Sequence, residues 1–492
     1  MLHKITKMMA HRPEPRILRR ICPVLSSQSW NESIQDTLCK YIEIPNVSPL
    51  FDKDVLTNGH QDRAVELLMN WVKAQEVPGL SMRLVTAEKR TPLIFIEIEG
   101  EGKTQETILM YGHMDKQPPN DGWMEGTGPY SPTIIDGKLY GRGGADDGYS
   151  IFASITAIKA LKAQKVPHAR IVITIEACEE SGSLDLPYYI ELLKAEIGSP
   201  SLVICLDSGC GNYDQLWLTA TLRGMMFGTL TIRVSKEGVH SGSASGIMPS
   251  TFRIARMLLD RIEDSATGKI LVPELYCDIP ENHQRYAREI AEILGQRIVN
   301  DFPLLEGVKP MADNYAELLL NRSWRPTLSY TGLDGIPPIA KAGNVLRPET
   351  VLGLSFRLPP TVDPAKAAAA VKAILERDPP YGAYVSFDCP KAAKGWKAPE
   401  LAPWVEGAIH KASQTVFGKP AVIWGEGGSI PFMGMLHNMF PETQFVITGV
   451  LGPNSNAHGP NEFLHIKMFH NVTVCMASVV ADHFSAKVAG KQ

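Results

Sequence analysis

Residues 108–118, Ile-Leu-Met-Tyr-Gly-His-Met-Asp-Lys-Gln-Pro, carry the pattern that decides the fold. An apolar run ends abruptly in two polar side chains, His113 and Asp115. Two later stretches, 171–175 and 202–206, repeat the apolar run and are also followed by acidic residues. Short apolar runs of this kind are typical of strands buried on both faces of a sheet. The three runs therefore predict the core of a buried sheet.

Helical patterns separate these predicted strands. Apolar residues recur at helical spacing in 148–164, and 186–196 shows a similar pattern. Alternation of strands and helices favours an α/β fold, with a mostly parallel sheet and helices on both faces. Further strands are predicted at 93–98, near 422–424 and at 445–450, and further helices at 31–44, 61–75, 403–416 and near the C-terminus.

The pattern changes after about residue 220. If a helical insertion around 281–300 is set aside, the predicted order becomes β-α-β-β-α-β, the ferredoxin-like α+β arrangement. We therefore predict that one domain, 221–392, is inserted into another that comprises 1–220 and 393–492. The segments behind this order are strands at 225–234, 328–330, 351–357 and 384–387, with helices at 249–263 and 364–376.

Composition excludes several classes of protein. The chain has 492 residues, of which 44% are hydrophobic and 21% charged, with a net charge of −4. These values are those of a globular protein and not of a disordered or fibrous one. No apolar run approaches the roughly 20 residues that span a bilayer, so we expect no membrane protein. The near-neutral charge also disfavours a nucleic-acid binder, which normally has a basic face.

The cysteines and the basic start of the chain bear on location. Eight cysteines without a C-x-x-C pair form neither a disulfide framework nor a zinc knuckle, so we expect a reducing cytoplasm. The first 20 residues are rich in Lys and Arg, which resembles a transit peptide in composition, but no apolar segment follows. We expect an irregular N-terminus of about 25 residues.

Five polar segments can converge on one crevice, because ligands gather at the carboxyl ends of strands in open α/β sheets. Two histidines and several carboxylates without cysteine suit catalytic Zn²⁺, Mn²⁺ or Co²⁺. So many carboxylates require compensation, which two divalent cations would supply. The candidate residues are His113, Asp115, Asp146, Glu179, Glu180, Asp207 and His458.

Each candidate also has a structural explanation when it is taken alone. Asp146 precedes a predicted helix and could cap it, and Asp207 could be a turn residue. Glu179 and Glu180 could be solvated, and His458 could be an exposed loop histidine. The occurrence of all five segments at strand or loop ends of one sheet is what favours a metal site.

The motifs resemble those of the M20 metallopeptidases, and within them the carnosinase-like dipeptidases. The resemblance rests on residues 112–118 (GHMDKQP), 140–147 (YGRGGADD), 179–182 (EESG) and 457–459 (AHG), and it extends from about residue 30 to the end. It implies a di-metal catalytic domain with an inserted lid and dimerisation domain. It also implies a homodimer that holds two divalent ions per subunit, with Zn²⁺ first and Mn²⁺ or Co²⁺ as alternatives.

The resemblance further implies a role for each residue. His113, Asp146 and Asp207 would hold one metal, and Asp146, Glu180 and His458 the other. Asp115 would orient His113, Glu179 would be the general base for a water that bridges the metals, and His240 would stabilise the oxyanion. Asn344, Arg357 and Ser429 would contact the substrate, with the arginine on a C-terminal carboxylate.

The implied function is hydrolysis of the amide bond of dipeptides or short peptides. A deacylase of N-acyl amino acids, of the desuccinylase or acetylornithine deacetylase kind, is the alternative. A non-catalytic binding module is a third reading, which the presence of Glu179 disfavours. We expect no nucleic-acid or membrane partner.

Overall fold

The computed structural model describes residues 26–102, 104–428 and 430–489. The expectation of an irregular N-terminus concerns residues that lie outside this range. The chain divides into two compact units: 1–219, 398–423 and 435–492 form unit 1, and 220–397 and 424–434 form unit 2. Among the described residues, none of the helices combines the length and apolar character needed to cross a membrane.

Unit 1 is built on a six-stranded sheet of order β1-β2-β6-β3-β7-β19. β6, β3, β7 and β19 run parallel, whereas β1 and β2 join the sheet antiparallel. The sheet is therefore mostly parallel, as predicted. Its strands are β1 (Leu80–Val85), β2 (Leu93–Ile98), β3 (Thr107–His113), β6 (Arg170–Glu176), β7 (Pro200–Cys205) and β19 (Gln444–Ile447).

Both faces of this sheet are covered, since every residue of β3 is buried. Helix α5 is buried over almost its whole circumference, and it packs against α15. A helix that is apolar all round belongs in the interior of a large domain. The helices of unit 1 are α3 (Gln35–Ile42), α4 (His60–Ala74), α5 (Tyr149–Ala163), α6 (Leu186–Ile197), α13 (Pro403–Phe417), α14 (Pro431–Met439) and α15 (Ile466–Ala489), of which 431–434 belong to unit 2.

A small antiparallel sheet of order β20-β5-β4 also lies in unit 1. It consists of β4 (Thr133–Ile135), β5 (Lys138–Tyr140) and β20 (Phe463–His465), with Phe463 opposite Tyr140. The pairing brings together two parts of the chain that are more than 300 residues apart.

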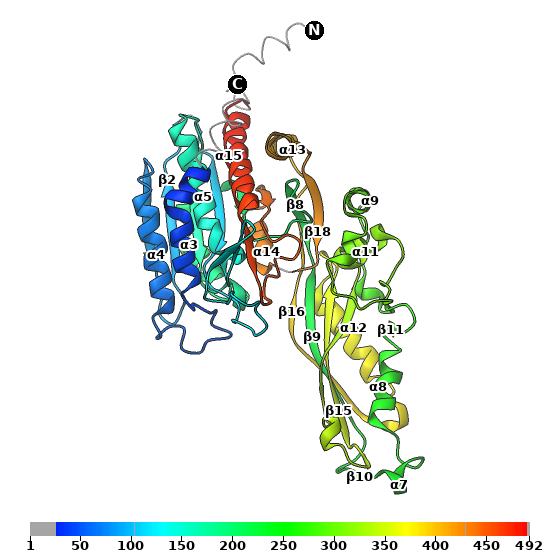
Figure 1. Ribbon diagram of the computed structural model, residues 1–492. Helices are drawn as coiled ribbons and strands as arrows, with labels where there is room; N and C mark the ends of the chain where they lie inside the picture. Colours follow the sequence, from blue (N-terminus) through cyan, green and yellow to red (C-terminus); the bar gives the residue numbers. More distant parts are fainter. Residues whose placement is uncertain (1–25, 103, 429, 490–492) are drawn as a thin grey trace, which may run out of the picture. The chain divides into compact units, whose positions relative to one another are not determined.

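Unit 2 has the predicted β-α-β-β-α-β order around a four-stranded antiparallel sheet, β13-β15-β9-β16. Residues alternate between buried and partly buried along β9 and β15, so one face of the sheet is the core face. Helices α8 and α12 supply the other side of that core (Figure 1). The main elements are β9 (Gly224–Arg233), α8 (Thr251–Leu259), β13 (Thr327–Asp334), β15 (Glu349–Leu358), α12 (Pro364–Glu376) and β16 (Tyr384–Ala393).

The region between α8 and β13 is more elaborate than the sequence predicts. The expected helical insertion is α9 (Glu281–Leu294) with the short α10 (Arg297–Asn300), and a further helix, α11 (Tyr315–Ser323), packs against α9. Asn314 caps α11 by accepting hydrogen bonds from the backbone amides of Ala316 and Glu317. This N-cap was present in the sequence but was missed.

Candidate metal centre

Three of the candidate segments leave neighbouring parallel strands at the same edge of the unit 1 sheet. His113 is the last residue of β3, and Asp207 follows β7 by two residues. Glu179 and Glu180 lie in a short turn, η3 (Glu179–Ser181), just after β6. β3 pairs in parallel with both β6 and β7, so these three exits lie side by side.

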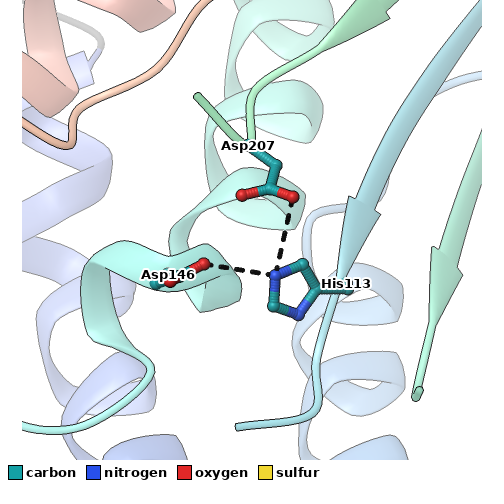
Figure 2. A group of neighbouring side chains, drawn as sticks. All are labelled: His113, Asp146 and Asp207. Carbon is teal, nitrogen blue, oxygen red and sulfur yellow. Dashed lines mark hydrogen bonds and ion pairs between the residues drawn. The ribbon is translucent and has the colours of Figure 1, made fainter. Parts of the chain in front are cut away.

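The first ligand group consists of His113, Asp146 and Asp207. The Nε2 atom of His113 lies 3.3 Å from Oδ1 of Asp146 and 3.8 Å from Oδ2 of Asp207. Figure 2 shows the imidazole facing both carboxylates. Asp146 reaches this position from the turn η2 (Gly144–Gly148), which leads into α5.

The second group consists of Asp146, Glu180 and His458. The Nε2 atom of His458 lies 3.0 Å from Oδ2 of Asp146 and 3.2 Å from Oε2 of Glu180. Asp146 therefore presents one oxygen to each group. Within each group, the ligand atoms lie within 4.8 Å of one another, which is close enough to share one ion.

The chemistry of these groups fits divalent cations. Each offers imidazole nitrogen and carboxylate oxygen, the donor set of catalytic zinc and related ions. The Oε1 atom of Glu180 is buried and has no hydrogen-bond partner among the described residues, which is costly for an oxygen that a cation does not satisfy. Burial and then the charge of Asp146 raise the pKa of Glu180, and burial raises the pKa of Asp207 to about 7.

Asp115 does more than the sequence suggested. The Nδ1 atom of His113 lies 3.1 Å from the backbone oxygen of Asp115 and 3.4 Å from its Oδ1. The carboxylate of Asp115 also accepts hydrogen bonds from the backbone amides of Glu179 and Glu180, each at 3.0 Å. One buried aspartate thus fixes both the histidine and the turn that carries the two glutamates.

Sequence reasoning missed two further side chains that contact the site. Gln117 donates a 2.6 Å hydrogen bond from Nε2 to Oε2 of Glu180. Asp147, joined to Asp146 by a cis peptide bond, accepts a hydrogen bond from the backbone amide of His113 at 3.1 Å. Gly112 leaves room for this contact, because a Cβ there would lie 2.1 Å from Oγ of Ser150 and 2.8 Å from Oδ2 of Asp147. The glycine directly before His113 was the feature of the sequence that could have indicated this close contact.

The remaining predicted residues belong to unit 2 or are not described. His240 and Asn344 are exposed and lie on neighbouring segments: β10 (Val239–His240) pairs with β14 (Val345–Leu346). The backbone oxygen of Asn344 accepts a hydrogen bond from the amide of Ser241. Ser429 lies outside the described residues. The parts that His240, Asn344 and Ser429 play toward substrate remain predictions.

Arg357 lies on β15 and contributes to a concentration of positive charge in unit 2. Burial, and then the charges of Arg357 and Arg322, together lower the pKa of Arg223 to about 9. Burial also lowers the pKa of Arg357. An anion bound near Arg357 would be favoured by this charge.

The comparison with protein families decides the classification. Residues 109–482 match the model of peptidase family M20/M25/M40. The chain belongs to the M20 peptidase family. Among M20 relatives, Beta-Ala-His dipeptidase of Mus musculus is 28% identical over 430 residues, which cover 76% of this chain and 83% of that protein. Cys-Gly metallodipeptidase DUG1 of Saccharomyces cerevisiae is 28% identical over 403 residues, covering 77% and 79%.

Solved structures of M20 proteins have the same fold. Human carnosine dipeptidase 1 superimposes with a TM-score of 0.75 at 22% sequence identity, over 95% of this chain and 98% of that one. The structure of the dipeptidase Dug1p from Saccharomyces cerevisiae gives a TM-score of 0.74 at 22% identity. This chain is therefore an M20 enzyme in both sequence family and fold.

From the raised pKa of Glu176 we predict that the stability of this M20 enzyme depends on pH when metal is absent. Burial and then the charge of Asp115 raise the pKa of Glu176 to about 7, although hydroxyl groups of Tyr111 and Ser183 donate to it. The folded protein thus keeps a proton that the unfolded chain releases above about pH 4.5. Between about pH 4.5 and 7 the free energy of unfolding should fall, by up to about 3 kcal/mol from this group.

Denaturant unfolding of Glu176→Gln in chelator, at several pH values from 5 to 8, tests this. The variant should show a shallower decline with rising pH than the wild type. Glu97→Gln is the control, because a hydrogen bond from Arg170 lowers the pKa of Glu97 and its contribution is already complete above pH 5. An unchanged slope in Glu176→Gln would contradict the assignment.

Proposed function

We propose that this enzyme is a metal-dependent dipeptidase that hydrolyses the amide bond of dipeptides or short peptides. The observation that carries the proposal is the pair of ligand groups that share Asp146, with Glu179 next to ligand Glu180. Two similar relatives are named for dipeptides, Beta-Ala-His and Cys-Gly, which supports a short peptide as substrate.

The two groups would hold two divalent ions, Zn²⁺ first and Mn²⁺ or Co²⁺ as alternatives. His113, Asp146 and Asp207 would hold one ion, and Asp146, Glu180 and His458 the other. When bound, the ions would polarise the amide carbonyl and make water acidic enough to give up a proton near neutral pH.

The buried thiols of Cys178, Cys205 and Cys475 agree with a reducing cytoplasm, which stays our expectation.

Glu179 would act as the general base. It does not belong to either ligand group, and its backbone is fixed through the hydrogen bond to Asp115. Burial and then the charge of Asp207 raise the pKa of Glu179 above its ordinary value. A base with a raised pKa can take the proton of the attacking water and later give it to the leaving amine.

Residues of unit 2 would contact the substrate. Arg357 would pair with the C-terminal carboxylate, which the surrounding positive charge of Arg223 and Arg322 favours. His240 would donate to the oxyanion, and Asn344 would contact substrate beside it, since their segments adjoin. Ser429 would add a further substrate contact.

We further propose a homodimer with shared sites. β13 is an edge strand of the unit 2 sheet, and residues 329–334 of it are exposed, including Tyr330 and Leu333. An exposed edge with apolar side chains is a surface on which a second copy can add to the sheet. His240 and Asn344 of one subunit would then serve the metal site of the other, whereas Arg357 and Ser429 would serve their own.

The substrate class can be tested directly. Protein stripped with EDTA should lose hydrolysis of dipeptides such as β-Ala-His and Cys-Gly and regain it when Zn²⁺ or Mn²⁺ is added. Rates measured for N-acetyl and N-succinyl amino acids should be at least tenfold lower than for dipeptides. The opposite preference would favour the deacylase, and full activity in the metal-free protein would exclude a metallohydrolase.

The base and the ligands can be separated by substitution. Glu179→Gln should retain both metals and lose about 10²–10⁴-fold in kcat, the usual contribution of a positioned base. His458→Ala should release metal instead. Elemental analysis together with kinetics measures both properties. A metal-free Glu179→Gln and a fully loaded His458→Ala would reverse the two roles.

Subunit mixing tests the shared site. His240→Ala and Glu179→Gln should each be inactive, and exchange of subunits between them should restore part of the activity, because one site of each heterodimer contains both wild-type residues. Glu180→Ala mixed with Glu179→Gln is the control, since both changes affect the same unit 1 site and every heterodimer stays inactive. A first mixture that exchanges subunits and stays inactive would rule out sharing.

A further inference from the structure

Arg142 and Glu462 form a buried ion pair that the catalytic proposal does not use. Their side chains are 1% and 0% exposed, and Nη1 of Arg142 lies 2.7 Å from Oε2 of Glu462. Charged side chains are almost never this buried unless they are paired. The pairing of β5 with β20 brings the two residues together, because Arg142 follows β5 and Glu462 directly precedes β20.

Glu462 holds the segment that carries Asp146. Its Oε1 atom accepts hydrogen bonds from the backbone amides of Gly143, Ala145 and Asp146, at 3.0, 3.1 and 3.2 Å. A carboxylate that accepts hydrogen bonds from several backbone amides of one turn and from an arginine is an anion seated in a backbone nest. Its oxygens are thereby occupied and enclosed, so Glu462 is not itself a metal ligand.

Arg142 holds the segment that carries His458. Its Nη2 atom donates to the backbone oxygen of Gly459 at 2.7 Å, and its Nε atom donates to that of Pro118 at 3.1 Å. Pro118 belongs to the segment that leaves β3 after His113. One guanidinium therefore joins the β3 exit, the Asp146 turn and the His458 loop.

The His458 loop depends on such contacts, because its backbone conformation is costly. His458 has a φ of 67°, and Asn454, Asn456 and Asn461 also have positive φ values. Residues other than glycine seldom adopt this region unless the surroundings impose it. Asn120 adds a 2.6 Å hydrogen bond to the backbone oxygen of His458. The side chain of His458 is nevertheless 58% exposed, so packing alone does not hold it.

We infer that Arg142 and Glu462 are positioning residues that set Asp146 and His458 at the separation needed to hold the second metal ion. The inference rests on the proposed function. If the pair is removed, the two ligand segments become ordered only when the ion binds. The cost of ordering them is then subtracted from the free energy of metal binding. Mutation of residues that hold metal ligands in place typically weakens metal affinity by about 10–100-fold.

A purely structural ion pair would affect folding stability and not metal affinity. Glu462→Gln keeps the shape of the side chain but removes its charge, and Arg142→Lys keeps the charge but cannot reach all three partners at once. Glu97→Gln is the matched control. The pair of Glu97 with Arg170 lies in the same unit, but the two side chains are 34% and 27% exposed, and the pair joins the strands β2 and β6.

The experiment titrates chelator-stripped protein with Zn²⁺ by calorimetry, with folding checked by circular dichroism. We expect two ions in the wild type and in Glu97→Gln. In Glu462→Gln, one ion should bind about 10–100-fold more weakly, and Arg142→Lys should show a smaller loss of the same kind. If Glu462→Gln does not fold, Arg142→Lys decides.

Folded variants with wild-type affinity for both ions would overturn the inference while leaving the proposed function intact. Variants that all fail to fold even with Zn²⁺ would also overturn it, since the pair would then be a folding element. A wild-type protein that binds no divalent ion would overturn the proposed function, and this inference with it.

Discussion

The geometry of the site depends on the carboxylate of Asp146, which faces His113 with one oxygen and His458 with the other. The three segments that meet there are far apart in the sequence, so only the tertiary structure can keep them in register.

Contacts with the end of helix α3 also hold the segment that leaves β3 in place. Tyr41 at the end of α3 donates to the backbone oxygen of Met114, and buried Lys116 donates to the backbone oxygens of Tyr41, Ile42 and Ile44. Lys116 thus satisfies carbonyl groups at the C-terminus of α3 and draws that helix to the site.

The electrostatics of the site follow from the same crowding. Burial opposes ionisation of Asp146, but hydrogen bonds from His113 and His458 hold its pKa below the ordinary value. Burial raises the pKa values of Asp147, Glu179 and Glu180. Without cations, these three side chains therefore keep their protons to a higher pH than free carboxylic acids do. Metal binding has to displace protons from the ligands among them, so metal affinity in such a site rises with pH.

Local signals explain why much of the fold was predictable. Helix α12 begins where the sequence predicts because Asp363 caps it and proline occupies its first turn. β1 was missed because it is an edge strand with no fully buried residue, and serine and arginine interrupt its apolar pattern. β13 was predicted only at 328–330, although it extends to Asp334, because a register shift between Tyr330 and Gly332 breaks its alternation. Edges and bulges are the places where tertiary pairing outweighs pattern.

The candidate site, like the fold, could be predicted from the sequence only in part. The polar residues at strand ends could be found from sequence, and the two ligand groups come together in the structure. The contacts that hold them could not be found, since Glu462 is 320 residues from Arg142 and Asp115 is 64 from Glu179. These contacts arise only after the chain has folded, and no spacing in the sequence encodes them.

The acidic residues of the unit 1 site would favour a dipeptide over an N-acyl amino acid. The arginines of unit 2 would bind a C-terminal carboxylate, but both substrate classes carry that group next to the scissile amide. They differ on the other side of the amide, where only the dipeptide has an ammonium group. Glu179 is an acidic side chain of the unit 1 site that belongs to neither ligand group. An ammonium group beside it would be attracted by its ionised form and would favour that form, whereas an acetyl group gains nothing there.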